Sequence, residues 1–254
     1  MPNHALGANP NAMLQAPPLS GLVREVRGFI ELPRLLFRFP SLARQPRGAG
    51  QPVLLLPGYG GGDGSTALLE AYLRLLGYSA RGWRLGRNSG NIGDLLPRIL
   101  KRLISAAERS NAQVTLIGWS MGGWLARELA RERPDLVRRV ITLGTPVIGG
   151  PKYTIVAHLY RRRGLDIEAI AAEVDARNQT PLLVPVTAFY SSLVAIVAWQ
   201  ACIDSPGAAV EHVEVRTTHL SFGFSPEVYE IIAGRLALDS KEMIQAANQG
   251  TPSS

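Results

Sequence analysis

The sequence predicts an α/β protein built on a mostly parallel, doubly wound sheet with helices on both faces. From residue 53 onward, short aliphatic and β-branched runs alternate with longer segments whose apolar residues recur at helical spacing. This alternation is typical of parallel strands joined by crossover helices. Residues 118–122 read Gly-Trp-Ser-Met-Gly between one such strand and one such helix. The 254 residues suffice for one α/β domain with an insertion.

The amino-acid composition is that of a globular protein, with 46% hydrophobic and 19% charged residues. The formal net charge is +7, and arginine supplies nearly all of the positive charge. Most arginines are scattered through the predicted helices, and one cluster stands at residues 161–163. Such charge suits anionic partners in general. Because no nucleic-acid recognition motif accompanies it, we expect no nucleic-acid partner, and the sequence indicates no partner protein.

The sequence also bears on compartment and cofactors. Cys202 is the only cysteine, so no intrachain disulfide can form, which is compatible with a reducing compartment. Residues 1–18 lack the basic start and the sustained apolar run of a secretory signal. We therefore expect a cytoplasmic protein. No His, Cys and Asp cluster has the spacing of metal ligands, and we expect neither a metal nor another cofactor.

Residues 1–48 are predicted to form a disordered start, to about residue 20, and an N-terminal helical extension. Residues 22–39 mix apolar side chains with arginines, and Pro33 is expected to break or kink this segment. One interpretation is a helix laid against the core. The other is an interfacial helix in peripheral contact with a membrane, with its arginines reaching the lipid surface. Nothing in the pattern requires lipid, so the first interpretation is favoured.

Residues 49–238 form the predicted α/β domain, and residues 239–254 a tail. The apolar run at 53–56 predicts the first strand, and residues 63–65 are suited to cap the helix that follows. Further strands are predicted at 79–85, 114–117, 137–143 and 212–216, and helices at 66–76, 92–107 and 226–236.

The uncharged stretch at residues 179–203 is long enough for a hydropathy window to report a membrane helix. Pro181 and Pro185 interrupt it, so a membrane span is disfavoured. Its first part, residues 182–190, predicts a buried parallel strand, and residues 193–201 predict a short core helix.

The organising motif is the strand, Gly-x-Ser-x-Gly turn and helix at residues 114–129. In such an elbow the serine takes a strained conformation at the top of the sheet, and its hydroxyl is exposed. Gly118 and Gly122 are expected where a side chain would collide with neighbouring backbone. The following helix directs its positive end toward Ser120, which suits a negative charge developing on a substrate oxygen.

This arrangement resembles the α/β-hydrolase family, in its lipase and esterase branch, over residues 50–238. Residues 57–62, Pro-Gly-Tyr-Gly-Gly-Gly, match the loop that these lipases open with a His-Gly or Pro-Gly pair. Residues 143–150, a Leu-Gly-Thr-Pro followed by a glycine pair, match the segment that leads into a cap. The resemblance implies an α/β-hydrolase fold with a small helical cap over residues 147–180. The glycine loop lacks the Lys-Ser or Lys-Thr of a phosphate loop and the spacing of a dinucleotide fingerprint.

The resemblance also implies chemical roles. Ser120 would be the nucleophile, and the backbone N–H groups of Tyr59 and Met121 would form the oxyanion hole. His219 follows the last predicted strand, where these hydrolases place the general base, and histidine titrates near neutral pH. The other histidines suit this role less well, because one lies in a strand pattern, one in the cap and one in the disordered start: His212, His158 and His4.

The third member of a serine–histidine–acid triad is missing from its usual position. Related sequences carry an aspartate in a Tyr-Ser-x-x-Asp-x-Ile-Val pattern after the penultimate strand, and here Val194 stands at the aspartate position. Valine can neither fix the histidine tautomer nor offset an imidazolium charge. Asp204 is the better candidate for a relocated acid, and Glu211 is the only other acid before the last strand. The alternative is that Asp204 is an ordinary loop or helix-end residue.

Three functions are compatible with these residues. The first is a serine hydrolase of carboxylic esters, whose substrate is a small-molecule or lipid ester. The second is a catalytically impaired homologue that acts as a binding or scaffold protein, because loss of the acid costs serine proteases about 10⁴ in rate. The third is an acyltransferase, which would need an acceptor pocket that the sequence does not show. We expect the first, with reduced activity.

Overall fold

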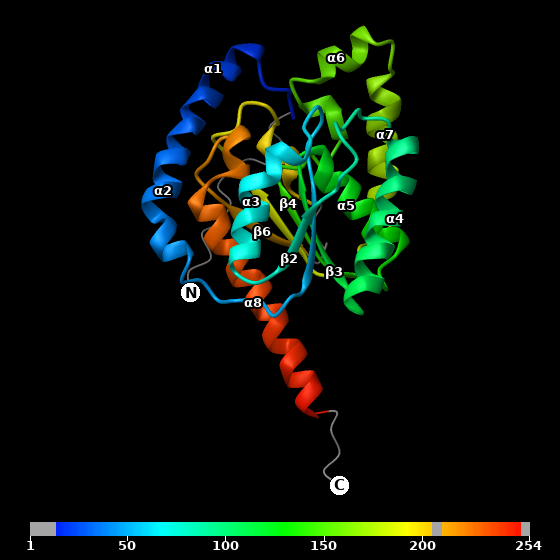
Figure 1. The fold of residues 1–254 in the computed structure, drawn as a ribbon. Helices are drawn as coiled ribbons and strands as arrows, with labels where there is room; N and C mark the ends of the chain where they lie inside the picture. The colour runs from blue at the N-terminus through cyan, green and yellow to red at the C-terminus, as the bar shows by residue number, and fades with distance from the viewer. Residues whose placement is uncertain (1–13, 205–209, 250–254) are drawn as a thin grey trace.

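The computed structural model describes residues 14–204 and 210–249, with the side chains of residues 239–249 excepted. Six strands form one sheet in the order β2-β1-β3-β4-β5-β6, and every neighbouring pair is parallel (Figure 1). The fold class predicted from the sequence is confirmed. The strands are β1 (Pro52–Leu56), β2 (Ser79–Gly82), β3 (Val114–Trp119), β4 (Val137–Leu143), β5 (Val186–Tyr190) and β6 (Val210–Glu214).

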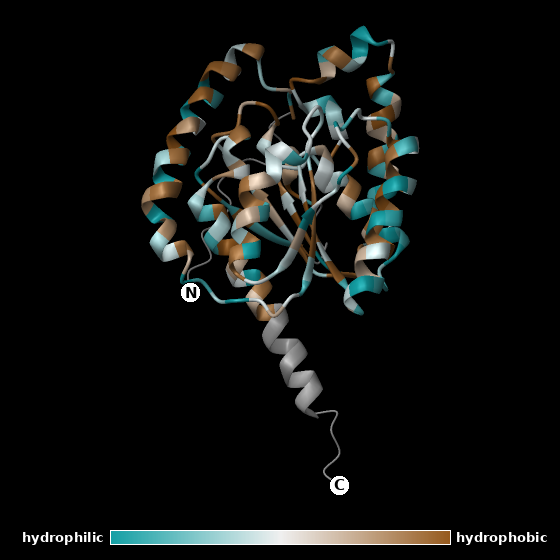
Figure 2. Cartoon of the chain, in the orientation of Figure 1, coloured by the Kyte–Doolittle hydropathy of each residue, from teal (hydrophilic) through white to brown (hydrophobic). Residues whose placement is uncertain are grey.

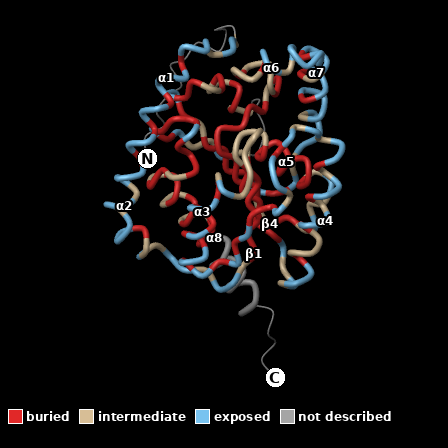
Figure 3. Tube along the Cα trace, turned by 45° about the horizontal axis from the view of Figure 1, so that its top comes forward, coloured by how far each residue is buried: buried red, intermediate tan, exposed pale blue. Residues whose placement is uncertain are grey.

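Helices cover both faces of the sheet, and each face has its own apolar core (Figures 1 and 3). Strand β1 is buried on both faces: Val53 and Leu55 join one cluster, and Leu54 and Leu56 join the other. Helices α3 and α8 supply the first cluster, and α4 and α5 the second. Their bounds are α3 (Asp63–Leu75), α4 (Ile92–Ser110), α5 (Met121–Glu132) and α8 (Pro226–Gln249).

The N-terminal extension is helical and lies against the core. It consists of η1 (Leu19–Gly21), α1 (Leu22–Glu25), η2 (Val26–Ile30) and α2 (Glu31–Leu42). Helix α2 packs against α8, and Arg38 forms an ion pair with Glu230 of that helix at 2.7 Å. Pro33 does not break the segment, because it lies in the first turn of α2, where no intrahelical bond needs its missing N–H.

The cap is inserted in the sequence between β4 and β5 and is made of η3 (Gly150–Tyr153), α6 (Ala157–Arg162) and α7 (Ile167–Asn178) (Figure 1). The core helix predicted at residues 193–201 is wrong. This stretch consists of turns followed by the short 3₁₀ helix η4 (Trp199–Cys202). An antiparallel bridge joins Val197 to Thr154 of the cap, so the backbone at Val197 pairs with the cap instead of forming the hydrogen bonds of a helix.

The predicted ends of two helices were also wrong. Helix α3 begins at Asp63 with Gly62 as its N-cap, so residues 63–65 lie inside the helix rather than before it. Helix α8 continues to Gln249, through most of the predicted tail. The predicted disordered start up to residue 13 and the last residues, 250–254, lie outside the described chain. No helix among the described residues is long and apolar enough to cross a membrane, and the cytoplasmic location stays a prediction.

Candidate active site

Ser120 lies at a sharp turn between the end of β3 and the start of α5. Its φ is 52° and its ψ is −120°, a conformation that residues other than glycine rarely adopt. The turn is held in place by two hydrogen bonds: the Ser120 N–H donates to the Leu143 carbonyl at 2.8 Å, and the Thr145 hydroxyl donates to the Ser120 carbonyl at 2.9 Å. The strained backbone is therefore supported by β4 and the loop that follows it.

The two glycines of the motif are required by close backbone contacts. A Cβ on Gly118 would lie 2.3 Å from the carbonyl oxygen of Gly122, and a Cβ on Gly122 would lie 2.2 Å from that of Leu56. No side chain fits at such distances, as the sequence predicted. The helix that follows Ser120 can therefore approach β1 and the loop after it.

The loop after β1 lies against the serine turn. A Cβ on Gly58 would be 3.4 Å from the Ser120 Cβ, so this loop and the turn are in direct contact. The side-chain amide of the buried Asn88 donates to the Pro57 carbonyl at 2.9 Å and thereby holds the start of this loop in place. The N–H groups of Tyr59 and Met121 donate no hydrogen bond within the described chain. Both residues line the same cavity as Ser120.

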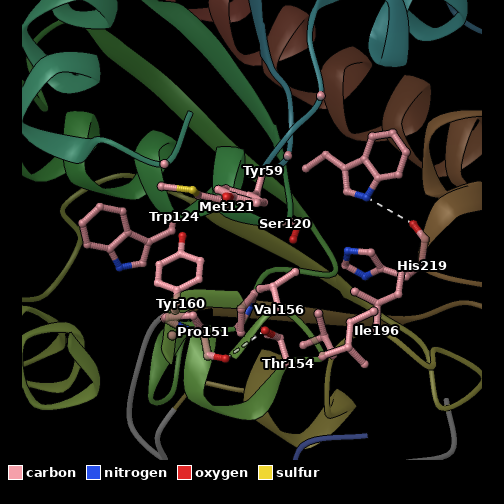
Figure 4. A pocket seen from close by; sticks show the side chains of 18 of the residues that line it. Tyr59, Ser120, Met121, Trp124, Pro151, Thr154, Val156, Tyr160, Ile196 and His219 are labelled. Carbon is pink, nitrogen blue, oxygen red and sulfur yellow. Dashed lines mark hydrogen bonds between the residues drawn. The ribbon is translucent and has the colours of Figure 1, made fainter. Parts of the chain in front are cut away.

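His219 is brought to the same cavity from the other side, by the loop after β6 (Figure 4). Its backbone carbonyl accepts a hydrogen bond from the Trp119 indole at 3.1 Å, and its ring meets Phe222 edge-on at a centroid distance of 6.1 Å. The residue is 4% exposed. Burial lowers the pKa of His219 to about 4, so the imidazole is neutral at pH 7 and can accept a proton.

The His219 ring has no hydrogen-bond partner at Nδ1 among the described residues. That edge of the ring lies close to Gly144, where a Cβ would be only 2.9 Å from Nδ1. The described structure contains no hydrogen bond between His219 and Ser120, although both side chains face the cavity. Such bonds often form only once substrate is bound.

Asp204 does not serve His219, and this expectation from the sequence is wrong. Its carboxylate forms a bidentate ion pair with Arg127 at 2.5 and 3.2 Å, with both side chains buried. Its backbone N–H donates to Nε2 of His212 at 2.9 Å. Burial opposes ionisation, but hydrogen bonding to His212 and the charge of Arg127 hold the pKa of Asp204 below its ordinary value. The carboxylate thus neutralises a buried arginine on α5, away from the imidazole.

The cavity has a volume of about 540 Å³, within the usual size range of small-molecule sites. The cap forms one wall, with Tyr160, Leu165 and Ile170 among its side chains (Figure 4). Arg163 of the cap donates to the Tyr59 hydroxyl at 2.5 Å, and thereby links the cap to the loop after β1. No group of three His, Cys, Asp or Glu side chains in the described part of the chain could hold a metal ion.

The sequence did not reveal several residues that shape the site. Asn88 and Thr145 act through hydrogen bonds to backbone carbonyls far away in the sequence, and polar residues in loops give no pattern that would predict this. Trp119 was expected only as the variable residue of the motif, yet its indole holds the loop of the base. The buried Glu25 belongs to the N-terminal extension, where apolar spacing was the only signal.

Several solved structures have a fold similar to that of this chain. It resembles a monoacylglycerol lipase from Paleococcus ferrophilus with 15% identity and a TM-score of 0.55, over 75% of this chain and 97% of that one. It resembles a structure of the metagenome-derived lipolytic enzymes LipS and LipT with 16% identity and a TM-score of 0.59, over 78% of this chain and 96% of that one. It resembles the Bacillus licheniformis lipase BlEst2 with 17% identity and a TM-score of 0.55, over 76% of this chain and 94% of that one. The family model of the alpha/beta hydrolase family matches residues 15–243. The chain therefore belongs to the alpha/beta hydrolase family.

Proposed function

We propose that this chain hydrolyses carboxylic esters with Ser120 as the nucleophile. His219 takes the Ser120 proton as the oxygen attacks the acyl carbon, and the N–H groups of Tyr59 and Met121 bind the oxyanion. The carbonyl re-forms, the ester C–O bond breaks, and the alcohol leaves with the proton from His219. Water then attacks the acyl-enzyme with His219 again as the base, which releases the acid and restores Ser120.

The observation that carries this proposal is the conformation of Ser120 at φ 52° on a turn facing the cavity. Backbone strain of this kind persists only where the surrounding structure holds it, and it gathers at functional sites. The glycine contacts and the Thr145 hydrogen bond supply that support. The low pKa of His219 adds a neutral imidazole facing the same cavity.

The substrate class follows from the walls of the cavity. Trp124, Val156, Tyr160 and Ile196 present apolar surface, and Glu173 is the only acidic residue among the described residues that line the cavity. An apolar acyl group fits such walls without leaving polar atoms unpaired. The activities named for the lipases of similar fold point the same way. We therefore propose esters of apolar acyl chains as substrates.

Hydrolysis of nitrophenyl esters of increasing acyl length tests this function. We expect turnover by the wild type and loss of at least about 10³-fold in Ser120→Ala. Turnover that is equal in the two folded proteins would contradict the proposal. Gly60→Val, at a φ of 74° in the same loop as Tyr59, should also reduce turnover without unfolding the domain.

A catalytically impaired binding protein is the second candidate, and the unpartnered Nδ1 of His219 favours it. Without a hydrogen bond at Nδ1, neither the tautomer nor the ring orientation is fixed. In that case apolar ligands would bind in the cavity without turnover. Binding of a fatty acid by the wild type, together with equal background hydrolysis in wild type and Ser120→Ala, would favour this candidate.

A further inference from the structure

One face of the N-terminal extension packs onto the two loops that follow β5 and β6. Gly21, Glu25 and Gly28 are buried and are spaced four and three residues apart, as on one side of a helix. A Cβ on Gly21 would lie 2.9 Å from the Cβ of Ala195, and one on Gly28 would lie 2.2 Å from the Thr218 hydroxyl. Because these two positions carry no side chain, the backbone of the extension can pack directly against both loops.

Between these glycines the Glu25 carboxylate binds both loops at once. Oε1 accepts the N–H of Ala195 at 2.7 Å, and Oε2 accepts the N–H of Leu220 at 2.9 Å. The residue is 1% exposed. Ala195 directly follows Val194, and Leu220 directly follows His219. A buried acid thus lies between the loop that lacks its aspartate and the loop that carries the base.

Two other acids near these loops bond residues that are not adjacent to His219 in the sequence. Glu214 accepts a hydrogen bond from the Ser192 hydroxyl at 3.0 Å, and Glu227 accepts the N–H of Arg216 at 3.2 Å. Among the described residues, Glu25 is the only acid that hydrogen-bonds a neighbour of His219 in the sequence.

We propose that Glu25 is a positioning residue for His219: its carboxylate, in the N-terminal extension, holds the loop that carries the base against the loop that contains Val194. The inference rests on the proposed function, in which His219 is the base. By holding the Leu220 N–H, the carboxylate fixes the loop of the base. A loop that is held in this way keeps the His219 ring in place to take the Ser120 proton, so we expect the effect in kcat and not in KM.

The test compares two nearly isosteric pairs in the full-length protein: Glu25→Gln against wild type, and Glu25→Asp against Glu25→Asn. Ester turnover and thermal unfolding are measured for each. We expect Glu25→Gln to lower kcat at least about tenfold with KM within about twofold. Glu25→Asp should retain more kcat than Glu25→Asn, because a carboxylate offers two acceptor oxygens to the two N–H groups and an amide offers one. If Glu25→Gln does not fold, the Asp–Asn pair decides.

Glu31→Gln is the matched control, because Glu31 is a second buried acid of the extension and pairs with Arg34. It should keep the wild-type kcat. Wild-type kcat in folded Glu25→Gln, or equal kcat in the Asp and Asn variants, would overturn the proposal. So would an equal loss of kcat in Glu31→Gln. Ser120→Ala in the same series separates the two claims, since turnover that survives in that variant contradicts the proposed function itself.

The opposite face of the same extension is exposed and apolar. We call it the N-terminal apolar face, and it appears as brown segments along α1 and α2 in Figure 2. Large apolar side chains on a monomer surface seldom gather in this way without a partner. The face comprises Val23 (75% exposed), Val26 (63%), Phe29 (56%), Ile30 (64%), Leu36 (76%) and Phe37 (87%).

The exposed charges that the extension itself carries at residues 14–42 are all positive. The only acids of residues 14–42, Glu25 and Glu31, are buried, whereas Arg24 and Arg27 are exposed. Apolar side chains with arginines and no exposed acid complement the acyl region and the phosphates of anionic lipid. Helix α1 and the cap helix α6 lie at the same end of the molecule (Figure 1), and Tyr160 of α6 lines the cavity.

We infer that the N-terminal apolar face binds the surface of an anionic lipid bilayer. Apolar side chains would enter the boundary between headgroups and acyl chains, and Arg24 and Arg27 would pair with phosphates. A protein partner is less well matched, because most protein surfaces present both charge signs. This inference does not depend on catalysis, since it concerns binding alone.

Sedimentation with vesicles tests the inference. One set contains phosphatidylcholine alone, and the other equal parts of phosphatidylcholine and phosphatidylglycerol. We expect binding to the anionic set and at least about tenfold weaker binding for Phe37→Glu. Leu183→Glu is the matched control, because Leu183 is 77% exposed in the loop before β5. Absence of sedimentation, an equal loss in Leu183→Glu, or a dimer in solution that Phe37→Glu dissociates would overturn it.

Discussion

Replacing Gly122 by alanine tests how the serine turn is built. A Cβ at this position would lie 2.2 Å from the Leu56 carbonyl oxygen and 2.7 Å from that of Pro57. Non-bonded heavy atoms normally stay about 3.5–4.0 Å apart, so the overlap exceeds about 1 Å. Both oxygens belong to the backbone of β1 and its loop, which cannot rotate away as a side chain would. Either the strand or α5 must therefore move.

The cost follows from the behaviour of packed interiors. Forcing an extra methyl group into a tight contact costs about 1–3 kcal/mol, and a clash with backbone on both sides belongs at the upper end, about 2–3 kcal/mol. For a chain of this size each kcal/mol lowers the melting temperature by about 2–4 °C, so we expect a decrease of about 4–12 °C. Turnover should fall as well, because Ser120 and the Met121 N–H move with the turn.

Gly234→Ala in α8 is the matched control, because no atom lies within 4 Å of its added Cβ. In the interior of a helix this change should stabilise the protein by about 0.5–1 kcal/mol. Thermal unfolding by circular dichroism and ester turnover are measured on both variants. If Gly122→Ala melts at the wild-type temperature with full turnover, the close contact between α5 and β1 does not exist and the reasoning fails.

Three further predictions concern the base, the buried ion pair and the cap. Because burial lowers the pKa of His219 to about 4, the acid limb of the kcat/KM profile should lie well below pH 6.5, and a limb at or above 6.5 would mean a solvated ring. Between pH 4 and 6.5 the His219 side chain binds a proton in the unfolded chain but not in the folded one, so the stability of the fold should decrease as the pH drops from about 6.5 toward 4. This decrease should be smaller in His219→Asn. Asp204→Asn leaves Arg127 buried without its counter-charge and should lower the free energy of unfolding, measured in urea, by about 3–5 kcal/mol. Turnover per folded molecule should stay within about twofold of the wild type. A large loss of turnover would return Asp204 to the catalytic site. Arg163→Leu breaks the hydrogen bond to Tyr59 and should raise KM about two- to fivefold with stability within about 0.5 kcal/mol, which unchanged KM at every acyl length would contradict.

The sheet and the serine turn could be predicted because their signals are local. The inner strands β1, β3 and β5 are short, mostly apolar runs that are buried on both faces. The turn has glycines at the two positions where backbone contacts leave no room for a Cβ. The helix predicted at residues 193–201 failed because that stretch bonds to distant partners. Thr154 pairs with Val197, and Glu25 accepts the N–H of Ala195. Neither contact leaves a periodic signal in the sequence.

The surroundings of the imidazole could not be predicted for the same reason. From the sequence, Asp204 was the nearest unassigned acid after β5, but the structure pairs it with Arg127 of α5, seventy-seven positions away. Glu25 lies in a segment that reads as apolar and basic, and nothing local indicates that its carboxylate is buried against two loops. The pairing of buried charges is decided by tertiary packing, since sequence spacing does not constrain it.

Labelling with a fluorophosphonate probe, followed by mass-spectrometric mapping of the modified residue, tests the central claim most directly. The probe reacts with a serine only where a neighbouring base and an oxyanion hole activate the hydroxyl. We expect the label on Ser120 in the wild type, no label in Ser120→Ala, and labelling slowed at least about 10²-fold in His219→Gln. Labelling at another residue, or equal labelling of folded Ser120→Ala, would contradict the assignment of Ser120 as the nucleophile.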